Sequence, residues 1–267
     1  MLKDITLGQY YPGTSVIHRL DPRTKFIGTL AFIISVFLFS SFIGYLVPTV
    51  FLGSVIILSQ VPLKTILKGL KAIMMLLVLT CMFNVFLTPG EVVFRFWFLK
   101  ATKEGIRLAV LMAIRLIYLV TGSSIMTLTT TPNQLTNAME ALMRPLRRIH
   151  VPVHELAMMM SIALRFIPIL MEETDKIRSA QIARGADFES GGIIKKVKGM
   201  IPLLVPLFIS AFRRANDLAM AMEARCYHGG DHRTQMKPLK YASVDHMAFA
   251  VLAVYLGLAI LCCVLRI

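Results

Sequence analysis

The chain has 267 residues, of which 56% are hydrophobic and only 16% are charged. Soluble domains usually contain about 45–50% apolar and about 25% charged residues, so this composition excludes an ordinary soluble domain and indicates a membrane protein. The formal net charge of +14 could also suit a nucleic-acid-binding protein, but the apolar segments favour lipid and protein partners and no nucleic acid.

Apolar segments of membrane-spanning length recur along the chain. Residues 26–63 carry no charge, and at about 1.5 Å per residue they fit two spans with a break near residues 40–45. Three more spans are predicted at residues 72–90, 106–131 and 247–265. The sequence therefore predicts an all-α, polytopic membrane protein with about five transmembrane helices.

The basic residues are unevenly distributed. Of the 29 lysines and arginines, 16 lie between Arg144 and Lys240. Cytoplasmic segments of membrane proteins carry an excess of these residues, which places the N-terminus, the 60–71 loop and residues 131–242 in the cytoplasm and the C-terminus outside. The basic loop around Arg95 runs against this rule.

Three parts follow from this pattern. Residues 1–130 hold an N-terminal segment and transmembrane helices 1–4. Residues 131–242 are too charged for the bilayer core and too apolar for an ordinary loop, which indicates cytoplasmic or interfacial helices. Residues 243–267 hold the C-terminal transmembrane helix.

Two long helices of the middle part end alike. They are predicted at residues 151–188 and 191–230, and their uncharged stretches are shorter than the about 17–25 residues that a span needs. Each closes on an arginine between small residues, and an offset of 41 residues superposes the two ends. The tips consist of Ala183, Arg184 and Gly185 in the first helix and of Ala224, Arg225 and Cys226 in the second.

The two arginines have an ordinary interpretation and a functional one. A cation in the last turn interacts favourably with the helix dipole, by about 0.3–1 kcal/mol, and Gly185 suits a helix end. Small neighbours, however, leave each arginine as the large group of its tip. Its fixed fork of donors suits carboxylates and carbonyl oxygens of a partner.

Two motifs carry a resemblance to a known family. Residues 8–25, GQYYPGTSVIHRLDPRTK, resemble the N-terminal signature of the transmembrane T component of energy-coupling-factor (ECF) transporters, which are ABC-type importers of vitamins and metal ions. The arginine tips resemble the coupling motifs of that family, although Cys226 stands where glycine or serine is more usual. The resemblance covers essentially the whole chain.

The resemblance implies a non-catalytic coupling subunit. Arg184 and Arg225 would dock into grooves of two cytosolic ATPase subunits, and the long helices would transmit nucleotide-driven movement to a membrane-embedded, substrate-binding S component. The chain itself would hold no cofactor and no metal, since the ATPase partners bind ATP and magnesium. It lacks a G-x-x-x-x-G-K-[ST] phosphate loop of its own. The expected location is the cell membrane of a prokaryote, and the transported vitamin or ion is not encoded in this chain.

Methionines suggest a second contact. Eleven of the 17 methionines lie from Met139 onward. Methionine fills cores, but its flexible side chain is also common on surfaces that accept several partners. The sequence therefore predicts contact with the S component at Met158, Met159 and Met160.

Other polar residues are candidates for metal binding, for a site in the membrane or for helix capping. The pairs His150/His154 and His228/His232 are interrupted by proline or glycine, which argues against a zinc site. Arg115, inside the fourth span, either pairs within the bundle or marks a functional site. Asp21 and Pro22 form a plausible cap and first turn of the first span.

Two rival functions stay open at this point. A self-sufficient secondary transporter or channel would need ionisable groups near the middle of the bilayer, where Arg115 is the serious candidate. A membrane-embedded enzyme would need a nucleophile or a histidine–acid constellation in the spans, and the sequence offers no such catalytic group. Both rivals predict activity without partners.

Overall fold

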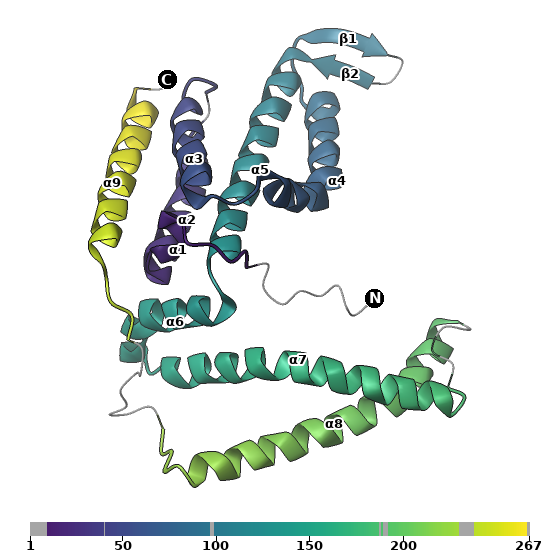
Figure 1. The fold of residues 1–267 in the computed structure, drawn as a ribbon. Coiled ribbons are helices and arrows are strands. Elements are labelled where there is room, and N and C mark those ends of the chain that lie inside the picture. Colours follow the sequence, from purple (N-terminus) through teal and green to yellow (C-terminus); the bar gives the residue numbers. More distant parts are fainter. Residues whose placement is uncertain are drawn as a thin grey trace. The chain divides into compact units, whose positions relative to one another are not determined.

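The computed structural model describes residues 10–39, 41–96, 99–186, 188, 192–229 and 238–265. The described chain divides into two compact units. The first, the bundle unit, consists of residues 10–138 and 238–265, and the second, the paired-helix unit, consists of residues 139–229. Figure 1 gives the order of the elements along the chain.

The bundle unit is built from helices and one β-hairpin. Its elements are α1 (Val16–Arg19), α2 (Pro22–Val36), α3 (Leu46–Ser59), α4 (Leu63–Leu87), β1 (Val92–Phe96), β2 (Leu99–Thr102), α5 (Lys103–Thr129), the first part of α6 (Pro132–Met143), and α9 (Ser243–Val264). The long helix α5 packs against α2, α3 and α4, while α9 packs against α2 and α3.

Aromatic side chains hold the centre of the bundle unit. Phe51 of α3 stacks on Tyr255 of α9 with ring centroids 4.3 Å apart, and Phe32 of α2 lies beside both. The Tyr255 hydroxyl shares a 2.6 Å hydrogen bond with Ser35, so its polar end is satisfied although it is buried. This cluster joins α9, the last helix in sequence, to the first two long helices.

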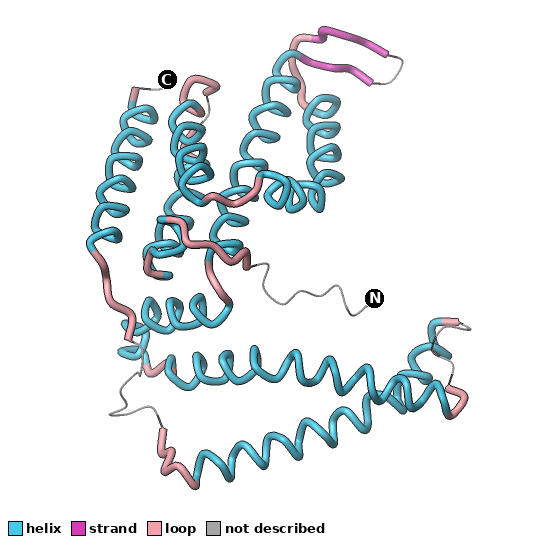
Figure 2. The backbone as a smooth tube through the Cα atoms, in the orientation of Figure 1, coloured by secondary structure: helices cyan, strands magenta, loops and turns pink. Residues whose placement is uncertain are grey.

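The connection between α4 and α5 is a hairpin, where the sequence analysis expected only a loop (Figure 2). The strands pair antiparallel, and the run Val92, Val93 and Phe94 has the β-branched and aromatic residues that favour strands. Thr102 ends β2 and caps α5, because its hydroxyl accepts the Gly105 N–H at 3.1 Å. The hairpin thus leads directly into α5.

The all-α membrane fold is confirmed, whereas the count of five spans is not. Among the described residues, α5, α9 and α7 (Val153–Ala183) are long and apolar enough to cross a membrane, and α4, bent by 59°, would be a fourth. With 15 and 14 residues, α2 and α3 are shorter than the about 20 residues of a typical span. The candidate α7 falls in the part that was expected outside the bilayer.

The paired-helix unit contains two helices of 31 residues each. After the end of α6, a 3-10 helix, η2 (Arg144–Ile149), leads to α7, and α8 (Ile193–Glu223) follows. The helical path changes at Pro145, since α6 ends at Met143 and η2 contains the proline. His154 at the start of α7 contacts Glu140 in the last turns of α6 at 2.8 Å.

The helices α7 and α8 run antiparallel. Arg214 donates to the Glu173 carboxylate at 2.9 Å, and the Gln181 side chain donates to the Pro202 carbonyl at 3.4 Å. From the first contact to the second, the residue number rises from 173 to 181 in α7 and falls from 214 to 202 in α8, so the two helices are antiparallel. Their C-terminal ends therefore point in opposite directions (Figure 1).

Candidate functional site

The first predicted tip closes α7 in a Schellman motif. Arg184 is the C-terminal cap, and Gly185 adopts a left-handed backbone with φ of 87°. The Gly185 N–H donates to the Ile182 carbonyl at 2.9 Å, and the Ala186 N–H donates to the Gln181 carbonyl at 2.9 Å. These two bonds satisfy carbonyls that the helix end leaves without partners.

The second predicted tip closes α8 in the same way. The Cys226 N–H donates to the Glu223 carbonyl at 2.8 Å, and the Tyr227 N–H donates to the Met222 carbonyl at 3.0 Å. Cys226 takes the left-handed conformation with φ of 55°, directly after Arg225. Every donor and acceptor lies 41 residues after its counterpart in the first tip, so the offset read from the sequence is also an equivalence of backbone geometry.

Both arginines are exposed at the ends of their helices, and the structure does not bring them together. Glu173 of α7 and Arg214 of α8 form an ion pair. Arg184 lies 11 residues after Glu173, and Arg225 lies 11 residues after Arg214. About 16 Å of helix therefore separates each tip from this ion pair. The flanking residues are exposed as well, namely Ala183, Gly185, Ala224 and Cys226.

This arrangement suits recognition of two acceptor sites. A guanidinium presents a rigid fork of N–H donors that binds carboxylates or carbonyl oxygens in pairs. The adjacent alanine, glycine and cysteine are too small to cover it. The donors of both guanidiniums are therefore accessible, at two separate places on the paired-helix unit.

The predicted methionine contact lies in the N-terminal half of α7. Met159 and Met160 are 53% and 54% exposed, and Met158 is partly buried. Three consecutive helical residues point in directions about 100° apart, so they cannot form one flat contact face. The three methionines are thus placed on α7, but not as a single patch.

A larger apolar surface on α8 was not identified from the sequence. Six exposed side chains follow the spacing i, i+3, i+4, i+7, i+8, i+11, which places them along one side of the helix. This spacing is the sequence signal that could have revealed the surface, whereas the absence of charge in the segment does not by itself indicate one. The stripe consists of Ile201, Leu204, Val205, Phe208, Ile209 and Phe212.

The N-terminal signature begins α2 as predicted. The Asp21 carboxylate accepts the Arg23 N–H at 2.9 Å, and Pro22 occupies the first turn, so the predicted cap is confirmed. The Arg23 guanidinium binds both Asp21 oxygens at 2.9–3.0 Å and lies 4.0 Å from the centre of the Tyr241 ring. Asp21 and Arg23 therefore act in positioning the start of α2.

A second carboxylate, which the sequence analysis missed, joins the starts of α2 and α9. Asp245 is 1% exposed and accepts the Asp21 N–H at 2.8 Å and the Ala242 N–H at 2.8 Å. The two backbone donors satisfy a charge that would otherwise be buried without partners. No local pattern could reveal a bond between residues that are 224 positions apart.

Lys25 closes the same end of the bundle unit. Its ammonium donates to the Thr129 carbonyl at 2.8 Å and to the His18 carbonyl at 3.2 Å. Thr129 is the last residue of α5, where a cation interacts favourably with the helix dipole. The Tyr11 N–H donates to the adjacent Leu128 carbonyl at 2.8 Å, so the signature supplies partners for two terminal carbonyls.

Arg115 pairs within the bundle, which was one of its two interpretations. Its guanidinium donates to the Tyr45 hydroxyl at 3.1 Å and to the Phe39 carbonyl at 2.9 Å. It also lies 5.3 Å from the centre of the Phe37 ring. These contacts tie α5 to the segment between α2 and α3.

The described residues contain no group of three or more histidine, cysteine or acidic side chains that could hold a metal ion. His154 pairs with Glu140, as described above, rather than with His150. His232, the second member of the other predicted pair, lies outside the described residues.

Comparison with known proteins agrees with the sequence resemblance. The sequence model of the cobalt transport protein family CbiQ matches residues 13–236, which include both tips. The chain is 54% identical over 248 residues to the energy-coupling factor transporter transmembrane protein EcfT of Thermosediminibacter oceani, with 93% of this chain and 94% of the relative covered.

Two more relatives carry the same name. EcfT of Clostridium kluyveri is 53% identical over 263 residues, covering 98% of this chain and 97% of the relative. EcfT of Bacillus subtilis is 45% identical over 259 residues, covering 97% and 98%. These names confirm the prediction of a non-catalytic transmembrane subunit of a transporter. The chain belongs to the CbiQ family and, within it, to the EcfT transmembrane components of energy-coupling factor transporters.

Proposed function

We propose that this chain couples two cytosolic ABC ATPase subunits to a membrane-embedded, substrate-binding S component. Arg184 and Arg225 would each enter a groove of one ATPase subunit. The observation that carries the proposal is the pair of exposed arginines, each in a Schellman motif with the same hydrogen bonds at the C-terminal end of its helix. Because α7 and α8 are antiparallel, the two ends point in opposite directions. Two equivalent, separated tips fit two similar partners.

The contribution of this chain to such a cycle is mechanical. Its partners would bind and hydrolyse ATP with magnesium, while the tips follow the approach and separation of the two ATPase subunits. Each of the helices α7 and α8 is about 46 Å long and runs continuously through its internal prolines, so each would carry movement of its tip along its length. The ion pair between Glu173 and Arg214 holds the two helices together.

The S component would contact the exposed apolar surfaces of the paired-helix unit. Met159 and Met160 on α7 and the apolar stripe of α8 are both exposed. A partner that covers these side chains where they face water would gain about 1.5–3 kcal/mol for each large side chain that becomes fully covered. Several S components, each with its own vitamin or ion, could use the same surface.

The proposed setting is the cell membrane of a prokaryote, with the N-terminus and both tips in the cytoplasm. The concentration of basic residues between Arg144 and Lys240 supports this orientation. Cytosolic ATPases could reach the tips only from that side.

Charge reversal of the arginines tests the coupling role. In the tagged protein purified from its native membrane in mild detergent, Arg184→Glu and Arg225→Glu are expected to lower the amount of bound ATPase subunits. Losing a buried, charge-assisted contact costs about 2 kcal/mol or more, which is about thirtyfold in affinity. Lys176→Glu on α7 and Arg213→Glu on α8 are matched controls, since both reverse an exposed charge before the tip.

The same purification distinguishes the coupling role from the function of a self-sufficient transporter. The coupling role requires two related ATPase subunits and at least one small hydrophobic protein in the mass spectrum of the purified complex. If both charge-reversed variants retain their ATPases, the docking role of the arginines is wrong. If the chain comes out alone and still moves solute in liposomes, the secondary transporter is the correct function.

A further inference from the structure

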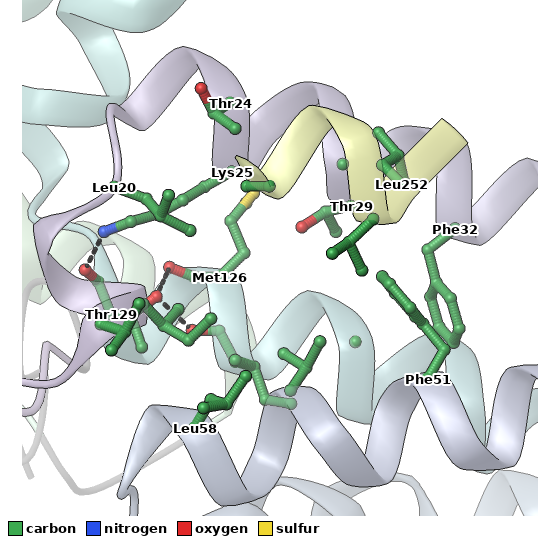
Figure 3. A pocket seen from close by; sticks show the side chains of 18 of the residues that line it. Leu20, Thr24, Lys25, Thr29, Phe32, Phe51, Leu58, Met126, Thr129 and Leu252 are labelled. Atoms are coloured by element: carbon green, nitrogen blue, oxygen red, sulfur yellow. Dashed lines mark hydrogen bonds between the residues drawn. The ribbon is translucent and has the colours of Figure 1, made fainter. Parts of the chain in front are cut away.

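The bundle unit contains an apolar cavity of about 230 Å³. It is lined by residues of α1, α2, α3, α5 and α9, which lie around it in Figure 3. The lining is almost entirely apolar and includes Leu20, Phe32, Phe51, Met126 and Leu252. These residues do not take part in the tips or in the apolar stripe of α8.

The depth of the cavity matches one leaflet of a bilayer. On α2 its lining extends from Thr24 to Phe32, a stretch of nine residues that rises about 12 Å along the helix. On α9 it extends from Val244 to Leu252, again nine residues. Half of the hydrocarbon core measures about 15 Å, so the cavity has the depth of one acyl-chain layer.

Charged groups lie at one end of this cavity, where Lys25 is near the carboxylates of Asp21 and Asp245, which accept from Arg23 and from backbone amides. The Lys25 side chain crosses that end towards Thr129, as Figure 3 shows, and its ammonium has two carbonyl partners. An ammonium carries three N–H donors, so it can still serve an additional acceptor. Arg19 is exposed on α1, next to the cavity residue Leu20. The opposite end, at Phe32 and Phe51, is apolar.

We propose that the cavity holds one acyl chain of a membrane phospholipid whose phosphate lies at the end marked by Lys25 and Arg19. The apolar walls, the leaflet depth and the cationic end each correspond to one part of such a lipid. The lipid would fill the space among five helices of the bundle unit.

A cavity-filling substitution tests the occupant. Gly28 lines the cavity, and a Cβ atom added there meets no other atom within 4 Å, so Gly28→Leu directs a larger side chain towards the space from an unobstructed Cβ position. Gly53→Leu on α3 is the matched control. Its added Cβ also meets nothing within 4 Å, and Gly53 does not line the cavity.

The probe is a phosphatidylglycerol with a photoactivatable diazirine near the end of one acyl chain, in liposomes that contain the full-length protein. We expect adducts on peptides that contain Met126 and Met247, both of which line the cavity. Gly28→Leu should reduce these adducts at least fivefold, and Gly53→Leu should leave them unchanged. Unlabelled phosphatidylglycerol should compete, whereas diacylglycerol, which lacks the phosphate, should compete at least fivefold less well.

Three results would overturn the proposal. Equal labelling of the wild type and both variants would show ordinary lipid around the protein rather than a site. Equal competition by diacylglycerol would remove the role of the cationic end. Crosslinks from a photoactivatable residue at Met126 to a protein partner would assign the cavity to that partner. Thermal unfolding of each variant in detergent checks folding, and phospholipid that co-purifies with wild type but not with folded Gly28→Leu provides a second measurement.

Discussion

Cys226 is the residue in which the two arginine tips differ most. It adopts φ of 55° at the position where the first tip has Gly185 with φ of 87°. A left-handed backbone costs a residue with a side chain about 1–2 kcal/mol, whereas glycine adopts it freely. The second tip therefore carries a local backbone strain that the first tip lacks.

This strain predicts that Cys226→Gly stabilises the protein. Part of the gain is lost because glycine makes the unfolded chain more flexible, which leaves about 0.5–1 kcal/mol in the free energy of unfolding. The reciprocal change, Gly185→Cys, should lower the free energy of unfolding. Thermal unfolding of the full chain in detergent measures both, and a lower stability of Cys226→Gly would mean that the thiol makes a stabilising contact.

Single residues also show where prediction from the sequence succeeds. The Asp21 cap and the two arginine tips were predictable because they depend on neighbours within six positions. Asp245 was not, since its role depends on a backbone donor at the other end of the chain. Arg115 allowed two interpretations until Tyr45 and the Phe39 carbonyl were placed beside it.

At the scale of elements, apolar length predicted the helices but not all of their boundaries. The hairpin β1–β2 escaped prediction because its few apolar residues follow a long apolar helix and show no strict alternation. The span count was uncertain for a similar reason. The uncharged segment of residues 26–63 predicts two full spans, but it covers α3 and all but the first four residues of α2, and both helices are shorter than a typical span.

The apolar stripe of α8 gives a prediction at this scale. The double variant Phe208→Ser, Phe212→Ser should lower the amount of co-purifying S component at least tenfold, because two exposed aromatic side chains would no longer be buried. Bound ATPase should be unchanged. Replacing Met158, Met159 and Met160 by alanine should have a smaller effect, since these residues do not share one face.

The control for the stripe is Ile57→Ser on α3, which removes a side chain that is 77% exposed in the bundle unit. It should leave the S component bound. If the methionine variant loses the S component while the double phenylalanine variant retains it, the contact lies on α7 and the stripe has another purpose.

The two units of the molecule carry different groups of functional side chains. The bundle unit holds the buried charged residues Asp21, Lys25 and Asp245, together with the partly buried Arg23, while the paired-helix unit holds both tips. Sequence composition predicted a membrane part and a more charged part. It could not predict the closure of the bundle unit, because that depends on α9 packing against the first helices.

Orientation in the membrane is the prediction that belongs to the whole chain. In a protein with Cys81, Cys262 and Cys263 replaced by alanine, a membrane-impermeant maleimide should label Cys226 in inside-out vesicles at least tenfold faster than in right-side-out vesicles. Cys226 is exposed, so access should depend on the side of the membrane. Faster labelling in right-side-out vesicles would place the tips outside and exclude cytosolic ATPases as their partners.

The bond between the Asp21 N–H and Asp245 has a consequence for biosynthesis. A ribosome makes Asp21 224 residues before its acceptor, and α9 is made after the helices α2 to α8. Throughout that interval the amide at the start of α2 lacks its native partner, and an unpaired donor in a buried place costs about 1–3 kcal/mol. The bundle unit therefore completes its polar closure only after α9 has been made, so a chain that is truncated before α9 has an unpaired amide at the start of its first long helix.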